Sequence, residues 1–129
     1  MIAISPFAGW NVVGPWVEKH KNTNNLAQYL DNVMVTNYGP YSPGNPKLTS
    51  VSLDYKKIHA PVLLIQGTSD ASLPWQTVQL LYSDMKPVDP NVELDLVPGG
   101  NHGLINKPKQ LNKDISAWYT KYGEGSSEK

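Results

Sequence analysis

The most informative absence is cysteine, which does not occur once among the 129 residues. A chain without cysteine has no disulfide, no thiolate nucleophile and no cysteine-ligated zinc or iron–sulfur centre. An excess of charge of one sign is also missing, because 11 Lys+Arg residues balance 11 Asp+Glu residues. That balance argues against a general nucleic-acid binder and against attraction to anionic membrane surfaces.

Long apolar runs are missing as well. No segment approaches the roughly 20 apolar residues that cross a bilayer. Prolines and glycines interrupt the apolar stretch over residues 1–17, which also lacks a basic start, so we do not expect a retained signal peptide. No feature assigns a compartment, and the cytoplasm is the default expectation.

The chain does contain alternating strand and helix patterns. Its length suits one domain with its own core, and we expect that domain over 1–122, followed by a flexible tail at 123–129. Apolar runs predict strands at 2–4, 61–66 and 92–96, and a helix is expected between each pair and after the last. This order is typical of an α/β fold with a small parallel sheet, about three strands, flanked by helices.

The N-terminal third gives the least regular pattern. Residues 7–22 are rich in Gly, Pro, Asn and Trp and are predicted to form a loop. Thr23 and Asn24 can cap the helix that follows. Its expected apolar face comprises Leu26, Tyr29, Leu30, Val33 and Met34. Three prolines and two glycines predict a second long loop over 37–52.

The later elements are clearer. The unbroken apolar run at 61–66 predicts an inner strand, whereas the alternation at 92–96 predicts an edge strand with one wet face. Pro74 suits the first turn of the helix between them. The last helix is expected over about 108–122, with Leu111, Ile115, Trp118 and Tyr119 buried.

Polar loops follow the second and third predicted strands. Asp70 lies in the first loop, and His102 lies in the second, within Gly99-Gly100-Asn101-His102-Gly103. Because ligands gather beyond the carboxyl ends of parallel strands, we expect both loops at one edge of the sheet. Asp70 can then fix the tautomer of His102 and make it a general base. The alternatives are that Asp70 caps the helix near Pro74 and that His102 is a solvated loop residue.

These residues resemble the C-terminal half of an α/β-hydrolase, closest to prolyl-oligopeptidase-like and dienelactone-hydrolase-like serine hydrolases. The matching features are Pro61 through Gly67, Asp70, Leu73-Pro74, Pro98, His102-Gly103 and Ala117-Trp118, with Ile4-Ser5-Pro6 and Trp10 before them. The resemblance implies a partial α/β-hydrolase fold. It also implies that Asp70 is the triad acid and His102 the triad base of an enzyme that hydrolyses an ester or peptide bond.

The nucleophile is where the chain departs from that family. The family carries its serine on a G-x-S-x-G elbow, and this motif does not occur in the sequence. Ser5 aligns with a later S-P position, and nothing around Ser69 marks it as a nucleophile. We therefore expect a hydrolase half-domain that is inactive alone. The alternatives are a non-catalytic binding or interaction module on the same scaffold, and a fragment of a longer enzyme if Met1 is not the true start.

Partners and cofactors follow from the same pattern. The open side of strand 2–4 is expected to be covered, either in a homodimer or by a chain that supplies the missing half. No cofactor is implied, and the histidines His20, His59 and His102 lack the spacing of metal ligands. Several aromatic residues either line an acyl pocket or pack in the core: Trp10, Trp16, Trp75, Tyr38 and Tyr41.

Overall fold

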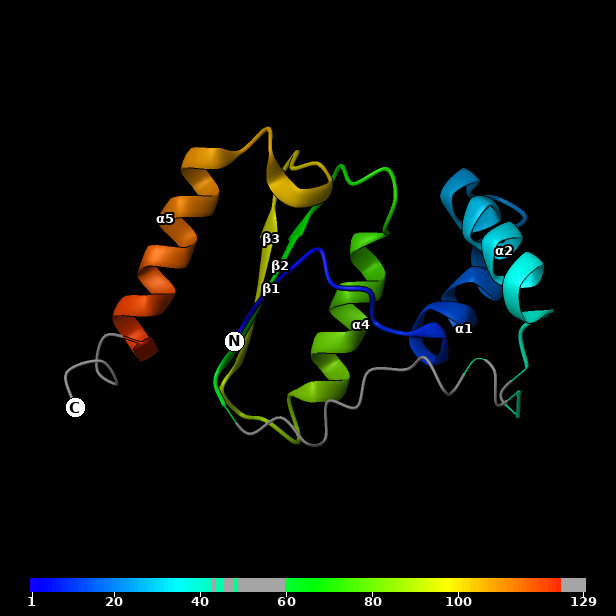
Figure 1. The fold of residues 1–129 in the computed structure, drawn as a ribbon, viewed down its shortest axis with the longest axis horizontal. Coiled ribbons are helices and arrows are strands. Elements are labelled where there is room, and N and C mark those ends of the chain that lie inside the picture. The colour runs from blue at the N-terminus through cyan, green and yellow to red at the C-terminus, as the bar shows by residue number, and fades with distance from the viewer. Residues whose placement is uncertain (43, 46–47, 49–59, 124–129) are drawn as a thin grey trace.

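The structure, a computed structural model, describes residues 1–42, 44–45, 48 and 60–123. One sheet contains β1 (Ile2–Ile4), β2 (Val62–Gly67) and β3 (Val92–Val97), in the order β1-β2-β3. Both strand pairs are parallel, and Leu64 lies between Ala3 on one side and Leu94 on the other. The expected small parallel sheet is therefore confirmed, and its strands all end at the same edge (Figure 1).

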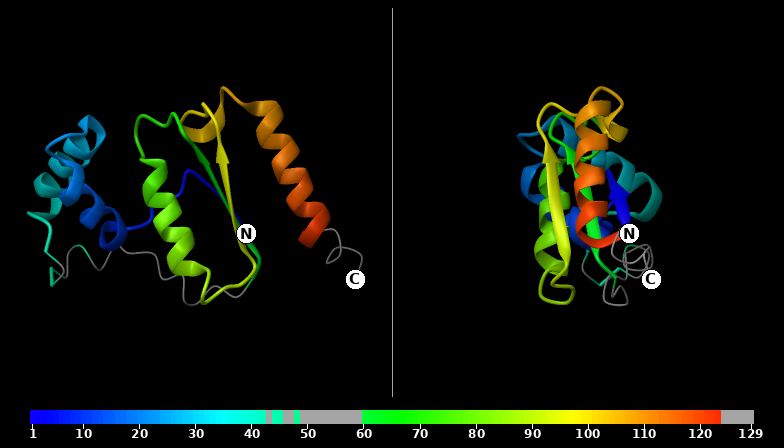
Figure 2. Two further views of the ribbon diagram at one scale, coloured as in Figure 1. Left: turned by 180° about the vertical axis from the view of Figure 1, so that it is seen from behind. Right: turned by 90° about the vertical axis from the view of Figure 1, so that its left-hand side faces the viewer.

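Helices cover both faces of this sheet. On one face α4 (Trp75–Met85) packs against β2 and β3, α1 (Trp10–His20) packs beside α4, and α2 (Asn25–Tyr38) packs on α1. On the other face lies α5 (Pro108–Trp118), which continues into a short π-helical turn, η3 (Tyr119–Gly123). Figure 2 shows the same layering from two further directions. No helix in the described ranges has the length and apolar character that a membrane crossing needs.

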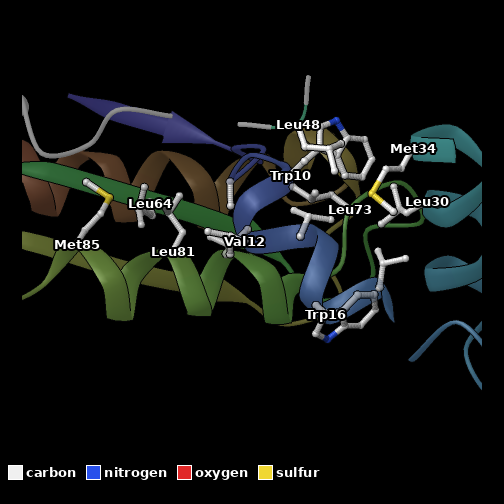
Figure 3. Close-up of a cluster of buried hydrophobic side chains, with 14 of the residues drawn as sticks. Trp10, Val12, Trp16, Leu30, Met34, Leu48, Leu64, Leu73, Leu81 and Met85 are labelled. Carbon is white, nitrogen blue, oxygen red and sulfur yellow. The ribbon is translucent and has the colours of Figure 1, made fainter. Parts of the chain in front are cut away.

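The central strand β2 divides two apolar cores. All its residues are buried, because it has a strand on either side and helices over both faces. Val62 and Leu64 belong to the larger core with α1, α2 and α4, whereas Leu63 and Ile65 belong to a smaller core under α5. Figure 3 shows the larger core, with Leu64 beside the side chains of α4. The unbroken apolar run of β2 follows from this two-sided burial.

Helix α1 occupies a stretch that the composition predicts to be a loop, so that prediction is wrong. Pro15 lies inside the helix, where a proline costs about 3 kcal/mol because it has no N–H and its ring clashes with the preceding turn. Burial outweighs that cost. Trp10, Val13 and Val17 recur at helical spacing and are buried in the larger core, and each such side chain contributes about 2 kcal/mol.

Helix α2 begins where the sequence predicts. Asn24 is its N-cap, and the Asn24 Oδ1 accepts a hydrogen bond of 3.0 Å from the backbone N–H of Ala27. The predicted apolar face is only partly right, because Leu30 is buried but Tyr29 is 57% exposed. The helix runs through Tyr38, so it overlaps the start of the predicted loop at 37–52.

Some predictions fall on residues outside the described ranges. They concern residues 43, 46–47 and 49–52 of the loop at 37–52, the histidine His59, and the tail beyond residue 123. Gly123 itself, the expected first residue of the tail, is the last residue of η3.

Strand β3 lies at the edge of the described sheet, as expected, but its acidic face is only partly open to water, with the Glu93 side chain 37% exposed. Glu93 and Asp95 are half-buried and line a cavity together with residues of α5. The helix covers this face because the apolar residues of β2 beside it need cover. Trp118, at the end of α5, is buried as predicted, whereas Tyr119, the first residue of η3, is 51% exposed and its predicted burial is wrong.

Candidate active site

The two loops expected to carry chemistry meet at the carboxyl edge of β2 and β3. The second loop continues into one 3-10 turn, η2 (His102–Leu104). Gly67 permits their approach, because a Cβ at this position would lie 2.1 Å from the carbonyl oxygen of Gly100. The backbone N–H of Ser69 also donates to that oxygen at 2.9 Å. Backbone contacts alone therefore hold the two loops together.

The structure brings Asp70 and His102 together across these loops. The Nδ1 atom of His102 lies 2.7 Å from Oδ2 of Asp70. The Asp70 side chain is only 1% exposed, whereas the His102 side chain is 56% exposed. An ionised carboxylate at Nδ1 favours the tautomer with the proton on Nδ1, which leaves Nε2 as the basic nitrogen. Nε2 makes no hydrogen bond within the described part of the chain. The catalytic roles of both residues stay predictions.

Asp70 is surrounded by hydrogen-bond donors. Its Oδ1 accepts from the backbone N–H groups of Ser72 at 2.7 Å and Leu73 at 2.9 Å, and its Oδ2 accepts from Nε2 of Gln66 at 2.9 Å. Burial alone raises the pKa of Asp70, but the hydrogen bonds from His102, Gln66 and the two N–H groups outweigh it, so the pKa lies below its ordinary value. The carboxyl is therefore ionised at neutral pH.

Asp70 also orders the loop in front of α4, but it does not cap that helix. The N-cap position of α4 is Pro74, and no side chain hydrogen-bonds there. The alternative interpretation of Asp70 as a helix cap is therefore wrong, although its position before the helix explains the appeal of that interpretation.

Gln66 is a supporting residue that the sequence pattern missed. It is fully buried in β2, and its Nε2 also donates to the carbonyl oxygens of Gly67 at 3.1 Å and Leu73 at 3.3 Å. A buried amide is tolerated only when it finds partners, so a lone polar residue inside an apolar inner strand was the available signal. Its hydrogen bond to Asp70 therefore anchors the carboxylate to β2.

The His102 loop has further anchors. Asn106 accepts from the N–H of Asn101 at 2.8 Å and donates its Nδ2 to the carbonyl oxygen of Gly99 at 2.9 Å. The N–H of Gly99 donates to Oγ1 of Thr68 at 2.8 Å, which joins this loop to the Asp70 loop again. Leu104 is fully buried just after His102. His102 is therefore presented by an anchored loop, as a preorganised site requires.

Neither candidate serine reaches the imidazole. Ser5 follows β1 directly, and its Oγ accepts a hydrogen bond of 3.2 Å from the N–H of Gly103. Ser69 is exposed beside Asp70. No hydrogen bond joins either hydroxyl to His102 in the ranges that the structure describes, so the contact between nucleophile and base is not made by these residues.

The aromatic residues and the cavities do not extend the site. Trp10 and Trp16 are buried in the larger core rather than lining an acyl pocket, and Trp75 is half-buried. A cavity of about 330 Å³ lies between β3 and α5, and it contains neither Asp70 nor His102. No cluster of three or more His, Cys, Asp or Glu side chains among the described residues has a geometry that could hold a metal ion.

That cavity contains a second shifted carboxyl. Burial, followed by a hydrogen bond with Asp114 and by its charge, raises the pKa of Asp95 to about 7. The Oδ2 atom of Asp95 is buried and has no hydrogen-bond partner in the described structure. This carboxyl therefore holds its proton far more readily than Asp70.

The small parallel sheet with helices on both faces is a partial α/β-hydrolase fold. The sequence model of the prolyl oligopeptidase family matches residues 12–125, and the chain belongs to that family. The expected kinship, inferred from the motifs, is confirmed.

Solved structures support the fold. The esterase Pf2001 of Pyrococcus furiosus, in space group P21, superimposes with a TM-score of 0.56 at 21% identity, covering 94% of this chain and 43% of the esterase. The same esterase in space group P212121 gives a TM-score of 0.56 at 19% identity, covering 94% and 44%. This chain therefore spans less than half the length of these esterases. No curated protein sequence matches it.

Proposed function

We propose that this chain is the part of a serine hydrolase that supplies the triad acid, Asp70, and the general base, His102. The observation that carries the proposal is the 2.7 Å contact between Nδ1 and Oδ2 at the ends of adjacent parallel strands. Membership of the prolyl oligopeptidase family and the fold shared with an esterase support ester or peptide bonds as the substrates. The substrate side of the pair is the exposed face of the His102 ring.

The geometry fits general-base catalysis. A serine hydroxyl attacks the carbonyl carbon and gives its proton to Nε2 of His102, and the imidazolium then gives that proton to the leaving oxygen or nitrogen. Asp70 stays ionised throughout and stabilises the imidazolium through Nδ1. Its lowered pKa supports this role, because the carboxyl does not take up a proton at neutral pH.

The nucleophile must come from outside these 129 residues, since the sequence has no G-x-S-x-G motif. Loss of the nucleophile costs several orders of magnitude in rate in enzymes of this type. We therefore expect the chain alone to show negligible hydrolysis and no labelling by a fluorophosphonate probe.

The open edge of β1 supports pairing with another polypeptide segment. Within the described sheet β1 pairs only with β2, and the apolar residues Met1, just before the strand, and Ile4, at its end, are 51% and 41% exposed. An unpaired strand edge with apolar flanks is a template for another strand. We propose that a parallel strand from the nucleophile-bearing half covers it, whereas a homodimer would join two such edges about a two-fold axis.

Light scattering at micromolar concentration distinguishes the two ways of covering this edge. A mass of twice 14.3 kDa for the chain alone supports the homodimer. A monomer that binds a nucleophile-bearing polypeptide supports pairing with the missing half. A monomer that binds no such polypeptide contradicts both.

The experiment on function begins with the coding DNA. The frame upstream of Met1 and the neighbouring genes are read for G-x-S-x-G, and the protein expressed with that segment is assayed on p-nitrophenyl esters and peptide anilides. His102→Ala and Asp70→Asn are each expected to lower kcat about 10³- to 10⁴-fold. His20→Ala is the matched control and should leave kcat unchanged, because this histidine of α1 lies against the ring of Trp16, at 4.8 Å between ring centroids.

Two outcomes would overturn the proposal. A His102→Ala enzyme that keeps its rate would show that His102 is not the base. A chain for which no nucleophile-bearing segment exists, and which binds small acyl or aromatic ligands without hydrolysing them, would be the non-catalytic module instead. A thermal-shift assay on the chain alone detects that binding.

A further inference from the structure

Ser5 joins the open edge of the sheet to the loop that carries His102. Its backbone N–H donates to the carbonyl oxygen of Ile65 at 2.8 Å, which makes it the last hydrogen bond between β1 and β2. Its side-chain Oγ accepts a hydrogen bond of 3.2 Å from the N–H of Gly103, which is 98 residues further along the chain. One residue therefore contacts both the central strand and the residue after the candidate base.

The backbone at this contact is strained on both sides. Ser5 has a φ of +52° and Leu104 has a φ of +60°, and no other non-glycine residue in the described ranges has a positive φ. Residues with a Cβ avoid this region because the Cβ approaches the carbonyl oxygen. Leu104 directly follows Gly103, so the two outliers flank a single hydrogen bond. Such strain persists only where the surrounding structure imposes it, and it clusters at functional sites.

We propose that Ser5 is a positioning residue for His102. Its hydroxyl fixes the N–H of Gly103, and this contact keeps the imidazole of His102 on the carboxylate of Asp70. The significance of this role rests on the proposed function, in which His102 is the general base. The contact is independent of the Asn106 and Thr68 anchors, because it is made from β1 rather than from the neighbouring loop.

The position of Ser5 also links the loop of His102 to the unpaired edge of β1. Its side chain is half-buried, and it follows the exposed residue Ile4 at the end of β1. A strand that pairs with β1 would order the backbone up to Ser5 and, through Oγ, the loop of His102. Pairing at the edge and placement of the base are then linked by one hydroxyl, although the edge lies on the far side of β2 from β3.

The test follows the imidazole of His102 in the chain as it exists. Nitrogen-15 NMR of histidine-labelled protein reports the tautomer of His102, and the line width of the Nδ1 proton reports its exchange with water. Ser5→Ala removes the hydroxyl and keeps the strain. Ser5→Gly removes the hydroxyl and relieves the strain, because glycine adopts positive φ readily. Ser83→Ala, an exposed serine of α4, is the matched control.

Both Ser5 variants are expected to increase the exchange of the His102 Nδ1 proton roughly three- to tenfold, the factor that corresponds to losing one net hydrogen bond. Ser5→Gly should do so with an unchanged or higher Tm, which a purely structural role would not produce. Ser83→Ala should leave the exchange unchanged. If Ser5→Gly and Ser5→Ala both keep exchange within twofold of the parent chain, Ser5 does not position His102.

Asp70→Asn separates this inference from the proposed function. It must abolish the preference for the Nδ1-protonated tautomer, because the carboxylate imposes that preference. If it does not, the acid–base pair itself is wrong, whatever Ser5 does. If Asp70→Asn has its effect and the Ser5 variants have none, only the positioning role of Ser5 is overturned. Labelling of Ser5 by a fluorophosphonate would also overturn it, by making Ser5 a nucleophile.

Discussion

Asp70 lies in the loop after β2 and Asp95 lies in the neighbouring strand β3, and the pKa values of these two carboxyls shift in opposite directions. Asp70 follows β2 and accepts hydrogen bonds from an imidazole, an amide and two backbone N–H groups, which lower its pKa. Asp95 lies inside β3, and one of its oxygens has no partner in the described structure. Its neighbour is Asp114, and its pKa rises to about 7.

The difference shows what makes a carboxylate fit for a triad. Burial raises the pKa of both groups, because it disfavours the charged form. Only Asp70 has donors that outweigh this cost. Gln66, Ser72 and Leu73 donate from nearby in the sequence, and His102 lies beyond the next strand. A perturbed carboxyl is therefore a site candidate only when its partners are also arranged for the task.

The largest loss of stability should come from removing the carboxyl of Asp70, which has more hydrogen-bond donors than that of Asp95. Asp70→Ala leaves the N–H groups of Ser72 and Leu73 without the Asp70 acceptor and removes one of the acceptors of the Gln66 amide, and we expect the free energy of unfolding to fall by about 3 kcal/mol. Urea denaturation measures it. Asp84→Ala, at an exposed site on α4, should change it by less than about 0.5 kcal/mol. An equally small loss at Asp70 would contradict the hydrogen-bond network described above.

A second substitution should push apart the loops after β2 and β3 without altering any charged group. Gly67→Ala places a methyl group against the backbone of Gly100, and we expect a loss of about 2 kcal/mol, since backbone cannot move aside like a flexible side chain. The NMR signals of His102 should shift while those around Asp95 stay fixed. Gly44→Ala is the control, because a Cβ there meets nothing within 4 Å. A Gly67→Ala protein as stable as this control would contradict the close approach.

Substitution of Asp95 should change the stability in the opposite sense, because its carboxylate destabilises the folded chain. Because the folded-state pKa of Asp95 is raised, the folded chain binds more protons than the unfolded chain between about pH 4 and pH 7, so stability falls as pH rises through that range. Asp95→Asn removes this slope, and we expect a gain of about 1 kcal/mol at pH 8 after allowance for solvent screening. Thermal unfolding across pH measures it, and a loss at pH 8 would show that the carboxylate is stabilising.

The sign is reversed for Asp70. Its folded-state pKa is lowered, so its contribution to stability is present above the unfolded-state pKa and is lost as pH falls through the folded-state pKa. Asp70→Asn should therefore differ most from the parent chain at neutral pH and least in strong acid. If the free energies of unfolding of the two proteins differ by the same amount from neutral pH down to the lowest accessible pH, this assignment is contradicted.

The sequence predicted the elements whose local signals agree with their surroundings. β2 is buried on both faces and reads as an apolar run, and Asn24 caps α2 as its side chain suggests. α1 was missed because Gly14 and Pro15 argue against a helix, whereas its burial depends on residues distant in sequence. Gly14 lies against the ring of Tyr41, where a Cβ would be 2.3 Å from it. Local propensity could not register that contact.

The candidate site likewise contains some residues that could be predicted from the sequence and others that could not. Asp70 and His102 could be predicted because parallel strands bring the ends of their loops to one edge. The supports from Gln66, Asn106 and Ser5 could not, because their roles depend on hydrogen bonds that no spacing reveals. Polar residues inside an apolar strand or directly after one were the available signal, and only a structure shows which partners they find.

The most direct measurement is a carbon-13 NMR titration of the Asp70 and Asp95 carboxyls in one sample, repeated with His102→Ala. We expect that Asp70 titrates below the ordinary pKa of an aspartate in the parent chain, that its titration moves to higher pH when the imidazole is removed, and that Asp95 titrates near pH 7 in both proteins. An Asp70 titration that is identical with and without the His102 imidazole would show that the two side chains do not form an acid–base pair.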